Sequence, residues 1–195
     1  MAAATIETLI AEQHLHVRPG TRLEAHELGD AGLVVVDAGE LDDAATIGTT
    51  HVDPFAFAAA HPSAQLTQAG DIIFRTAPTP RAWVDPDGSK VVASPARVLR
   101  IDSADPGGLI PELVAADIEH SSGGAGSWRR WTLRRVSPPA RLALRAALAD
   151  LAARREALAR RIEALDTYSE LLAAGVVAGR VSLADDAADS ASEPQ

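Results

Sequence analysis

Residues 138–172 have the sequence PPARLALRAALADLAARREALARRIEALDTYSELL, and this stretch decides the fold class. Leucine or isoleucine recurs in steps of four, three and seven residues, which is typical of the a/d seam of a heptad helix. A helix with so narrow an apolar stripe is too exposed to form the core of a small domain. It therefore predicts pairing with a second helix, from this chain or another. The predicted interface residues are Leu144, Leu148, Leu151, Arg155, Leu158, Ile162, Leu165 and Leu172.

Two polar residues, Arg155 and Ser169, interrupt this seam. An arginine at an a position lowers the stability of a coiled coil but can determine its register or its partner. The alternative is that Arg155 extends to solvent from a helix that is merely amphipathic. The first reading predicts that Arg155→Leu makes the helix pair more stable and less uniform.

The segment before the helix predicts one mixed, β-rich domain over residues 1–136. Short apolar runs that end at turn residues predict strands, and two runs flanking residues 85–88 predict a hairpin. Gly175 and Gly179 predict the end of the helix region (137–183), and residues 184–195 predict a disordered acidic tail. The fold class is therefore α+β, with a long C-terminal coiled-coil helix. The predicted strands are 32–36, 46–52, 72–74, 82–84, 90–93, 98–101 and 132–136, and the predicted helices are 5–13, 110–120 and 139–174.

The composition excludes several classes of protein. Apolar residues make up 47% of the 195 residues, enough for a core, but aromatics make up only 4%, which indicates a small aliphatic core. The absence of cysteine excludes disulfides and thiolate zinc sites. The N-terminus lacks the pattern of a signal peptide, and no stretch approaches the ~20 apolar residues of a membrane span. We expect a soluble, cytoplasmic protein without a membrane partner.

The charge is distributed unevenly along the chain. The net charge of −9 argues against nucleic acid, but residues 1–64 hold 10 acidic and 2 basic residues, whereas residues 65–137 hold 8 acidic and 9 basic. Any surface that meets phosphate is therefore expected in the middle segment.

Several motifs of this chain, taken in order, resemble a known family. A Leu-x-x-x-Gly-Asp-Ile-Ile-Phe segment precedes Val-Val-x-Ser-Pro-x-x-Val-Leu-Arg-Ile, followed by a helix, a Gly-rich loop, Pro-Pro and the heptad helix. This order resembles the target-recognition unit of the specificity subunit of type I restriction-modification systems, over about residues 30–180. A Glu-Gln pair that the family often has after Pro-Pro is replaced here by Ala140-Arg141-Leu142. The matching residues before the seam are Leu66, Gly70, Asp71, Ile72, Ile73, Phe74, Val91, Val92, Ser94, Pro95, Arg100, Gly123, Gly124, Gly126, Pro138 and Pro139.

The resemblance implies a non-catalytic DNA-recognition subunit. It implies double-stranded DNA as one partner, and an adenine-N6 DNA methyltransferase subunit that supplies the chemistry. Full specificity subunits carry two recognition domains and two helices, whereas this sequence has one of each. A half subunit implies a homodimer, or a second specificity half, joined through the helix, and a bipartite site. The rival hypothesis is a coiled-coil adaptor that binds protein and no DNA.

Candidate DNA contacts lie in the middle segment, because arginine neutralises phosphate and can recognise guanine. Arg129 and Arg130 lie between two tryptophans beside the Gly-rich loop, and Arg75 and Arg81 are expected in a loop after the 72–74 strand. The alternative is that these are ordinary solvated arginines. The full predicted set is Arg75, Thr76, Arg81, Lys90, Ser127, Arg129 and Arg130.

Other chemistry is not indicated. Trp83, Trp128 and Trp131 could stack on bases, but core packing is favoured in a domain with few aromatics. His14 and His16 share one face of a strand, without a further ligand at a suitable spacing, so no metal site is predicted. No nucleophile elbow, P-loop or adenine-methylase motif is present. We predict no cofactor and no catalytic residue.

Overall fold

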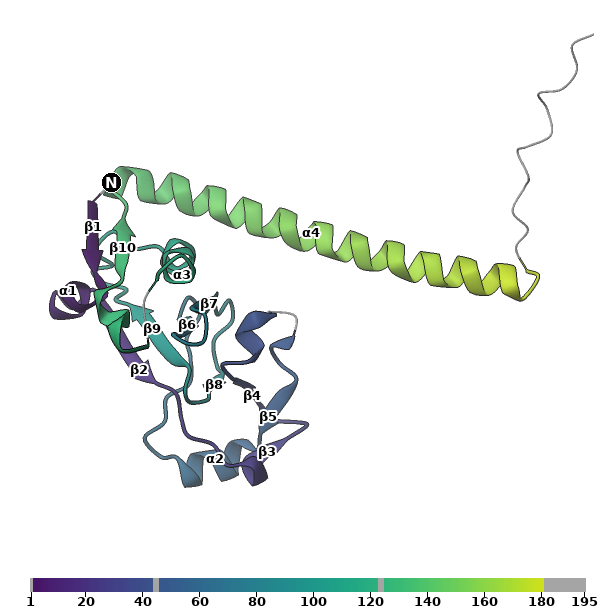
Figure 1. The fold of residues 1–195 in the computed structure, drawn as a ribbon, viewed down its shortest axis with the longest axis horizontal. Helices are drawn as coiled ribbons and strands as arrows, with labels where there is room; N and C mark the ends of the chain where they lie inside the picture. Colours follow the sequence, from purple (N-terminus) through teal and green to yellow (C-terminus); the bar gives the residue numbers. More distant parts are fainter. Residues whose placement is uncertain (1, 44–45, 123–124, 181–195) are drawn as a thin grey trace, which may run out of the picture. The chain divides into compact units, whose positions relative to one another are not determined.

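A computed structural model describes residues 2–43, 46–122 and 125–180 (Figure 1). The chain separates into a domain, Met1–Arg145, and a second unit from Ala146 onward. The described part of the domain contains three β-sheets with short helices, followed by the start of a long helix. The predicted α+β class, a β-rich domain with a long C-terminal helix, is confirmed.

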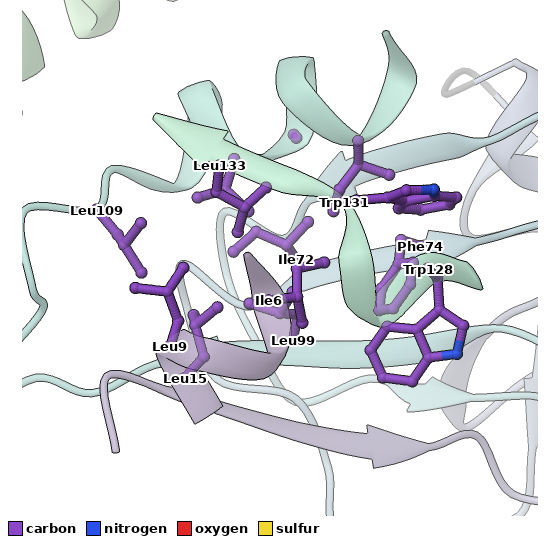
Figure 2. Close-up of a cluster of buried hydrophobic side chains, with 13 residues drawn as sticks. Ile6, Leu9, Leu15, Ile72, Phe74, Leu99, Leu109, Trp128, Trp131 and Leu133 are labelled. Carbon is purple, nitrogen blue, oxygen red and sulfur yellow. The ribbon is translucent and has the colours of Figure 1, made fainter. Parts of the chain in front are cut away.

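A four-stranded antiparallel sheet organises the main core. Its order is β2 (Leu15–Pro19), β9 (Arg97–Ile101), β6 (Ile72–Arg75) and β7 (Arg81–Val84). Helix α3 (Pro111–Glu119) packs against β6 and β7, and Pro111 suits its first turn because the missing N–H needs no partner there. The buried side chains beneath it include Phe74, Leu99, Trp128 and Trp131 (Figure 2). The core packing predicted for Trp128 and Trp131 is confirmed, since they are 7% and 5% exposed.

Three strands of the second four-stranded sheet come from the acidic N-terminal third of the sequence, and the fourth comes from the middle segment. Its order is β3 (Leu28–Gly29), β5 (Thr50–Val52), β4 (Leu33–Val36) and β8 (Val91–Val92). The β4–β8 pair is parallel and the other pairs are antiparallel. Helix α2 (Pro54–Ala60) is capped by the Asp53 side chain, and its Phe57 packs into the small cluster under this sheet. The 3-10 helix η1 (Ala25–Glu27) leads into β3, and η2 (Glu40–Asp42) lies between β4 and β5.

The chain's first residues belong to the fold. Strand β1 (Ala2–Thr5) pairs antiparallel with β10 (Thr132–Arg135), and helix α1 (Ile6–Ala11) follows with Ile6 and Leu9 fully buried. No strand was predicted at residues 2–5, because an alanine run carries little β-propensity. The pairing with β10, more than a hundred residues away in sequence, stabilises this strand.

The predicted hairpin around residues 85–88 is wrong. β7 pairs with β6, while β8 crosses to the other sheet and pairs with β4. The residues between β7 and β8 instead bond back to the segment before β6. Asp85 donates its N–H to the Asp71 carbonyl at 2.9 Å, and Ser89 donates its N–H to the Thr67 carbonyl at 2.9 Å. The local turn signal is genuine, but long-range pairing separates its two flanking strands.

The long helix α4 runs from Pro138 to Val177, 40 residues. It passes through Gly175 and ends before Gly179, whose φ of +66° is accessible to glycine at low cost. The prediction of an exit at Gly175 is therefore wrong. Arg180 donates its N–H to the Gly175 carbonyl at 2.8 Å, which closes the helix end. The predicted acidic tail, 184–195, lies outside the described residues.

The middle of the apolar seam of α4 is exposed, whereas Leu144, Leu148 and Leu172 are half-buried. Leu151, Leu158, Ile162 and Leu165 are 55–61% exposed, although each belongs to the predicted seam. Within the described part of the chain, no helix is long and apolar enough to cross a membrane.

Candidate nucleic-acid interface

The nine basic residues of segment 65–137 fall into two groups. Six have a carboxylate oxygen within 4.0 Å, and for the other three the described residues give no such contact. A cation already paired with a carboxylate contributes little to binding a phosphate, because its charge is neutralised before the ligand arrives. The paired residues are Arg75, Arg81, Lys90, Arg100, Arg134 and Arg135, and the unpaired residues are Arg97, Arg129 and Arg130.

Arg75 holds two elements of the domain together. It is the last residue of β6, not a loop residue, and is 6% exposed. Its guanidinium binds both carboxylate oxygens of Asp42 in η2 and donates to the Ala38 carbonyl at 2.6 Å. These hydrogen bonds lower the pKa of the Asp42 carboxyl, with a smaller contribution from Arg81. Buried and fully engaged, Arg75 is placed to stabilise the fold, not to touch a ligand.

Arg81 and Lys90 are also engaged. Arg81 opens β7, not a loop, and its Nε lies 3.5 Å from Asp42. The Lys90 ammonium lies 2.7 Å from Asp85, a carboxylate with no exposed surface, and 5.5 Å from the Trp83 ring centroid. Burial alone would raise the pKa of Asp85, but hydrogen bonds from Lys90 and Thr67 outweigh it and the pKa is lowered. The two predicted contacts therefore have internal partners.

Two of the three unpaired arginines lie against one aromatic side chain. The Arg97 and Arg129 guanidinium carbons lie 5.4 Å and 5.3 Å from the Trp128 ring centroid. Arg130 follows Arg129 directly, and both are exposed, whereas Arg97 is half-buried. We call Arg97, Trp128, Arg129 and Arg130 the arginine cluster.

Two separate elements bring the arginine cluster together. Arg97 begins β9, and the other three residues end the 3-10 helix η4 (Ala125–Arg130). Trp128 is locked by an edge-on contact with Phe74 of β6, with ring centroids 5.7 Å apart. The Trp128 ring thus contacts two guanidiniums from different elements, and these cation–π contacts do not neutralise their charge.

The remaining predicted contacts are Thr76 and Ser127, both half-buried. Thr76 follows β6, and Ser127 lies in η4 next to Trp128. Of the seven predicted DNA-binding residues, Ser127, Arg129 and Arg130 therefore share η4, while Arg75, Arg81 and Lys90 are tied to carboxylates. Arg97 was not predicted; its sequence signal is weak, since only the fold shows that it faces Trp128.

Metal chemistry has no support among the described residues, where no group of three histidine or acidic side chains is placed to hold an ion. His14 instead bonds the Asp105 carbonyl at 2.9 Å, and His16 lies 3.6 Å from Asp102.

Comparison with solved structures shows what the fold of this chain resembles. The β-rich domain followed by a long helix resembles part of the fold of solved specificity subunits of type I restriction-modification systems. No protein-family model and no curated protein matches the chain.

Three solved structures carry that likeness. The S subunit of M. genitalium matches with a TM-score of 0.58, 14% identity and 89% of this chain covered. The HsdS subunit of Thermoanaerobacter tengcongensis matches with a TM-score of 0.51 and 10% identity, over 82% of this chain. A structure described as showing assembly and conformational transition of the type I R-M system matches with a TM-score of 0.54 and 12% identity, over 87% of this chain. The alignments cover 39–45% of those chains, so this chain spans less than half of their length.

Proposed function

We propose that the chain is a single-domain DNA-recognition subunit of a type I-like restriction-modification system, without catalytic residues of its own. The observation that carries the proposal is the arginine cluster, which offers three unneutralised guanidiniums on a domain with the specificity-subunit fold. Contacts of this kind to phosphate position a protein on DNA, and arginine also recognises guanine bidentately in the major groove. The proposed partners are double-stranded DNA and an adenine-N6 methyltransferase subunit.

The exposed seam of α4 supports a second copy of the chain as the helix partner. One domain and one helix per chain then give a two-fold dimer with two recognition domains, and the paired helices set the distance between two half-sites. A palindromic bipartite target is the consequence of that symmetry.

Arg155 favours an antiparallel pair of helices. In a parallel homodimer each a position faces its own copy, so two Arg155 guanidiniums would meet in one apolar layer. In an antiparallel dimer a positions face d positions, and Arg155 faces Leu165 of the second copy. The same register pairs Leu148 with Leu172, and Leu144 with Val176, which is 38% exposed in the single chain. This register places Arg155 opposite a leucine instead of opposite a second Arg155, and it places Ser169 opposite Leu151.

Methylome sequencing with and without this gene tests the function. We expect loss of one adenine-methylated bipartite motif on deletion, and its return with the wild-type gene but only weakly with Arg97→Gln/Arg129→Gln/Arg130→Gln. A palindromic motif supports the dimer. Unchanged methylation in the deletion strain would refute the proposal.

A coiled-coil adaptor that binds no DNA is the second candidate. The observation in its favour is that six of nine middle-segment cations are already paired, in a chain of net charge −9. An adaptor should bind no DNA, whereas a DNA-recognition subunit should lose affinity for DNA steeply as salt rises, so a salt-dependent DNA-binding assay on the complex distinguishes the two.

A further inference from the structure

The three guanidiniums of the arginine cluster are held to different degrees. Arg97 is half-buried and belongs to β9, a strand that is paired on both sides, and it lies opposite Pro19 of β2 and Phe74 of β6. Arg129 and Arg130 are exposed and lie in η4, outside both four-stranded sheets. A half-buried side chain on a central strand has lost part of its rotamer freedom before any ligand binds, whereas an exposed arginine keeps it.

The backbone that leads into Arg97 is also fixed. Gly20 donates its N–H to the Ala96 carbonyl at 2.9 Å, and Ser94 donates its N–H to the Thr21 carbonyl at 2.8 Å. A Cβ atom on Gly20 would lie 2.6 Å from the Ala96 carbonyl oxygen, so the two segments approach as closely as a glycine allows. Ala96 itself is 1% exposed. Arg97 therefore begins its strand from a point that the fold determines.

The guanidinium of Arg97 keeps its capacity to form hydrogen bonds. Its central carbon lies 5.4 Å from the Trp128 ring centroid, and no acceptor among the described residues takes a hydrogen bond from it. None of its nitrogens is buried without a partner, so these donors reach solvent. Trp128 is itself fixed by its edge contact with the Phe74 ring (Figure 2). Arg97 thus presents a planar fork of N–H donors in a defined position at the surface.

The two kinds of DNA contact make different demands on an arginine. A phosphate accepts hydrogen bonds over a wide range of positions, whereas guanine offers O6 and N7 in one plane of the major groove and requires a fork held in register with them. We propose that Arg97 reads the guanine of one G·C pair in the site that its domain contacts, and that Arg129 and Arg130 contact neighbouring phosphates. The inference rests on the proposed function, because it assigns roles within the proposed DNA interface.

The salt dependence of binding does not distinguish these roles. Each of the three guanidiniums brings a positive charge close to the phosphate backbone, so each releases counterions and contributes to the salt slope. The dependence on base sequence does distinguish them. Loss of a phosphate contact weakens binding to every duplex alike, whereas loss of a base contact removes the discrimination at one position of the site.

The test measures the dissociation constants of a set of labelled duplexes for the full chain with its proposed methyltransferase partner. One duplex carries the motif found by methylome sequencing, and each of the others has one base pair of that motif replaced. Replacing a base pair that the wild-type complex reads should weaken binding about 5- to 150-fold. Arg97→Met keeps an unbranched stem beside Trp128 but removes the donors. This variant should lose the penalty at one G·C pair and keep the penalties at the other positions, which also shows that it is folded.

Arg129→Met is the matched control, because it makes the same substitution at a guanidinium 5.3 Å from the same Trp128 ring. It should weaken binding to all the duplexes by one common factor. Unchanged penalties in Arg97→Met, a penalty lost at an A·T pair, or a motif without a G·C pair would overturn the base reading while leaving the proposed function in place. Binding by the wild-type complex that ignores base sequence would refute the proposed function, and the base reading with it.

Discussion

Removing the three unpaired arginines tests the proposed DNA interface most directly. Each phosphate contact contributes about 0.9 to the slope of log affinity against log salt on duplex DNA. Arg97→Gln/Arg129→Gln/Arg130→Gln should therefore reduce that slope by about 2.7 for one engaged domain. Between 50 and 200 mM salt, the wild-type affinity should then fall about 40-fold more than the affinity of the variant.

The assay is fluorescence anisotropy with a labelled duplex, using the chain with its proposed methyltransferase partner so that weak binding by the isolated chain does not obscure the result. The variant should remain folded, because losing exposed cation–π contacts costs only about 0.5–1 kcal/mol each. The melting temperature checks this directly.

The matched control removes three charges that already have partners, through Arg81→Gln/Arg134→Gln/Arg135→Gln. These guanidiniums lie at 3.5, 2.6 and 3.3 Å from Asp42, Asp117 and Glu12. The salt slope should change little, because these side chains release few counterions on binding. An equal drop in slope for both variants would show that net charge, and not the arginine cluster, governs binding, and an unchanged slope in the first would refute the reasoning.

Three further predictions concern stability. Asp71→Ala should lower the free energy of unfolding by about 3 kcal/mol, because it leaves the partly exposed Arg100 without its bidentate partner. This value is at the low end for a broken buried ion pair. Urea denaturation measures the change, and a decrease below about 1 kcal/mol would contradict the prediction. The lowered pKa of Asp85 means that its stabilising effect is complete above the unfolded-state pKa and is lost as pH falls through about 4 and below. Unfolding free energies from pH 3 to 7 should show that loss, and Asp85→Asn should flatten it. Arg155→Leu should raise the thermal stability of the dimer while making its oligomeric state less uniform; unchanged melting and mass would leave Arg155 as a side chain that simply extends to solvent.

Local signals in the sequence were sufficient for several of the regular elements. The heptad spacing predicted α4 closely, because helix periodicity is a property of neighbouring residues. The runs that became β4, β6 and β9 were likewise apolar and bounded by turn residues. Prediction failed where pairing is long-range. β1 has no strand signal of its own, and the turn before β8 separates strands that enter different sheets.

For the candidate interface too, local features were predicted from the sequence and long-range pairings were not. The sequence located the basic middle segment and singled out Arg129 and Arg130, because clustered charge beside a Gly-rich loop is visible in one dimension. It could not show that Arg129 and Arg130 differ from Arg75, Arg81 and Lys90 in having no carboxylate partner. That distinction depends on carboxylates up to 39 residues away in the chain, since Asp42 faces both Arg75 and Arg81.

By itself, then, the sequence determined the α+β class, the exposed heptad helix and the family that the chain resembles. Periodicity, composition and motif order are all carried by residues near one another in the chain. Tertiary structure alone decided which cations remain free, because a charge is neutralised by whatever the fold brings within about 4 Å of it. It also placed Arg97 of β9 against Trp128 of η4 and so completed the arginine cluster. Arg97 precedes the other members of the cluster by 31 or more residues in the sequence.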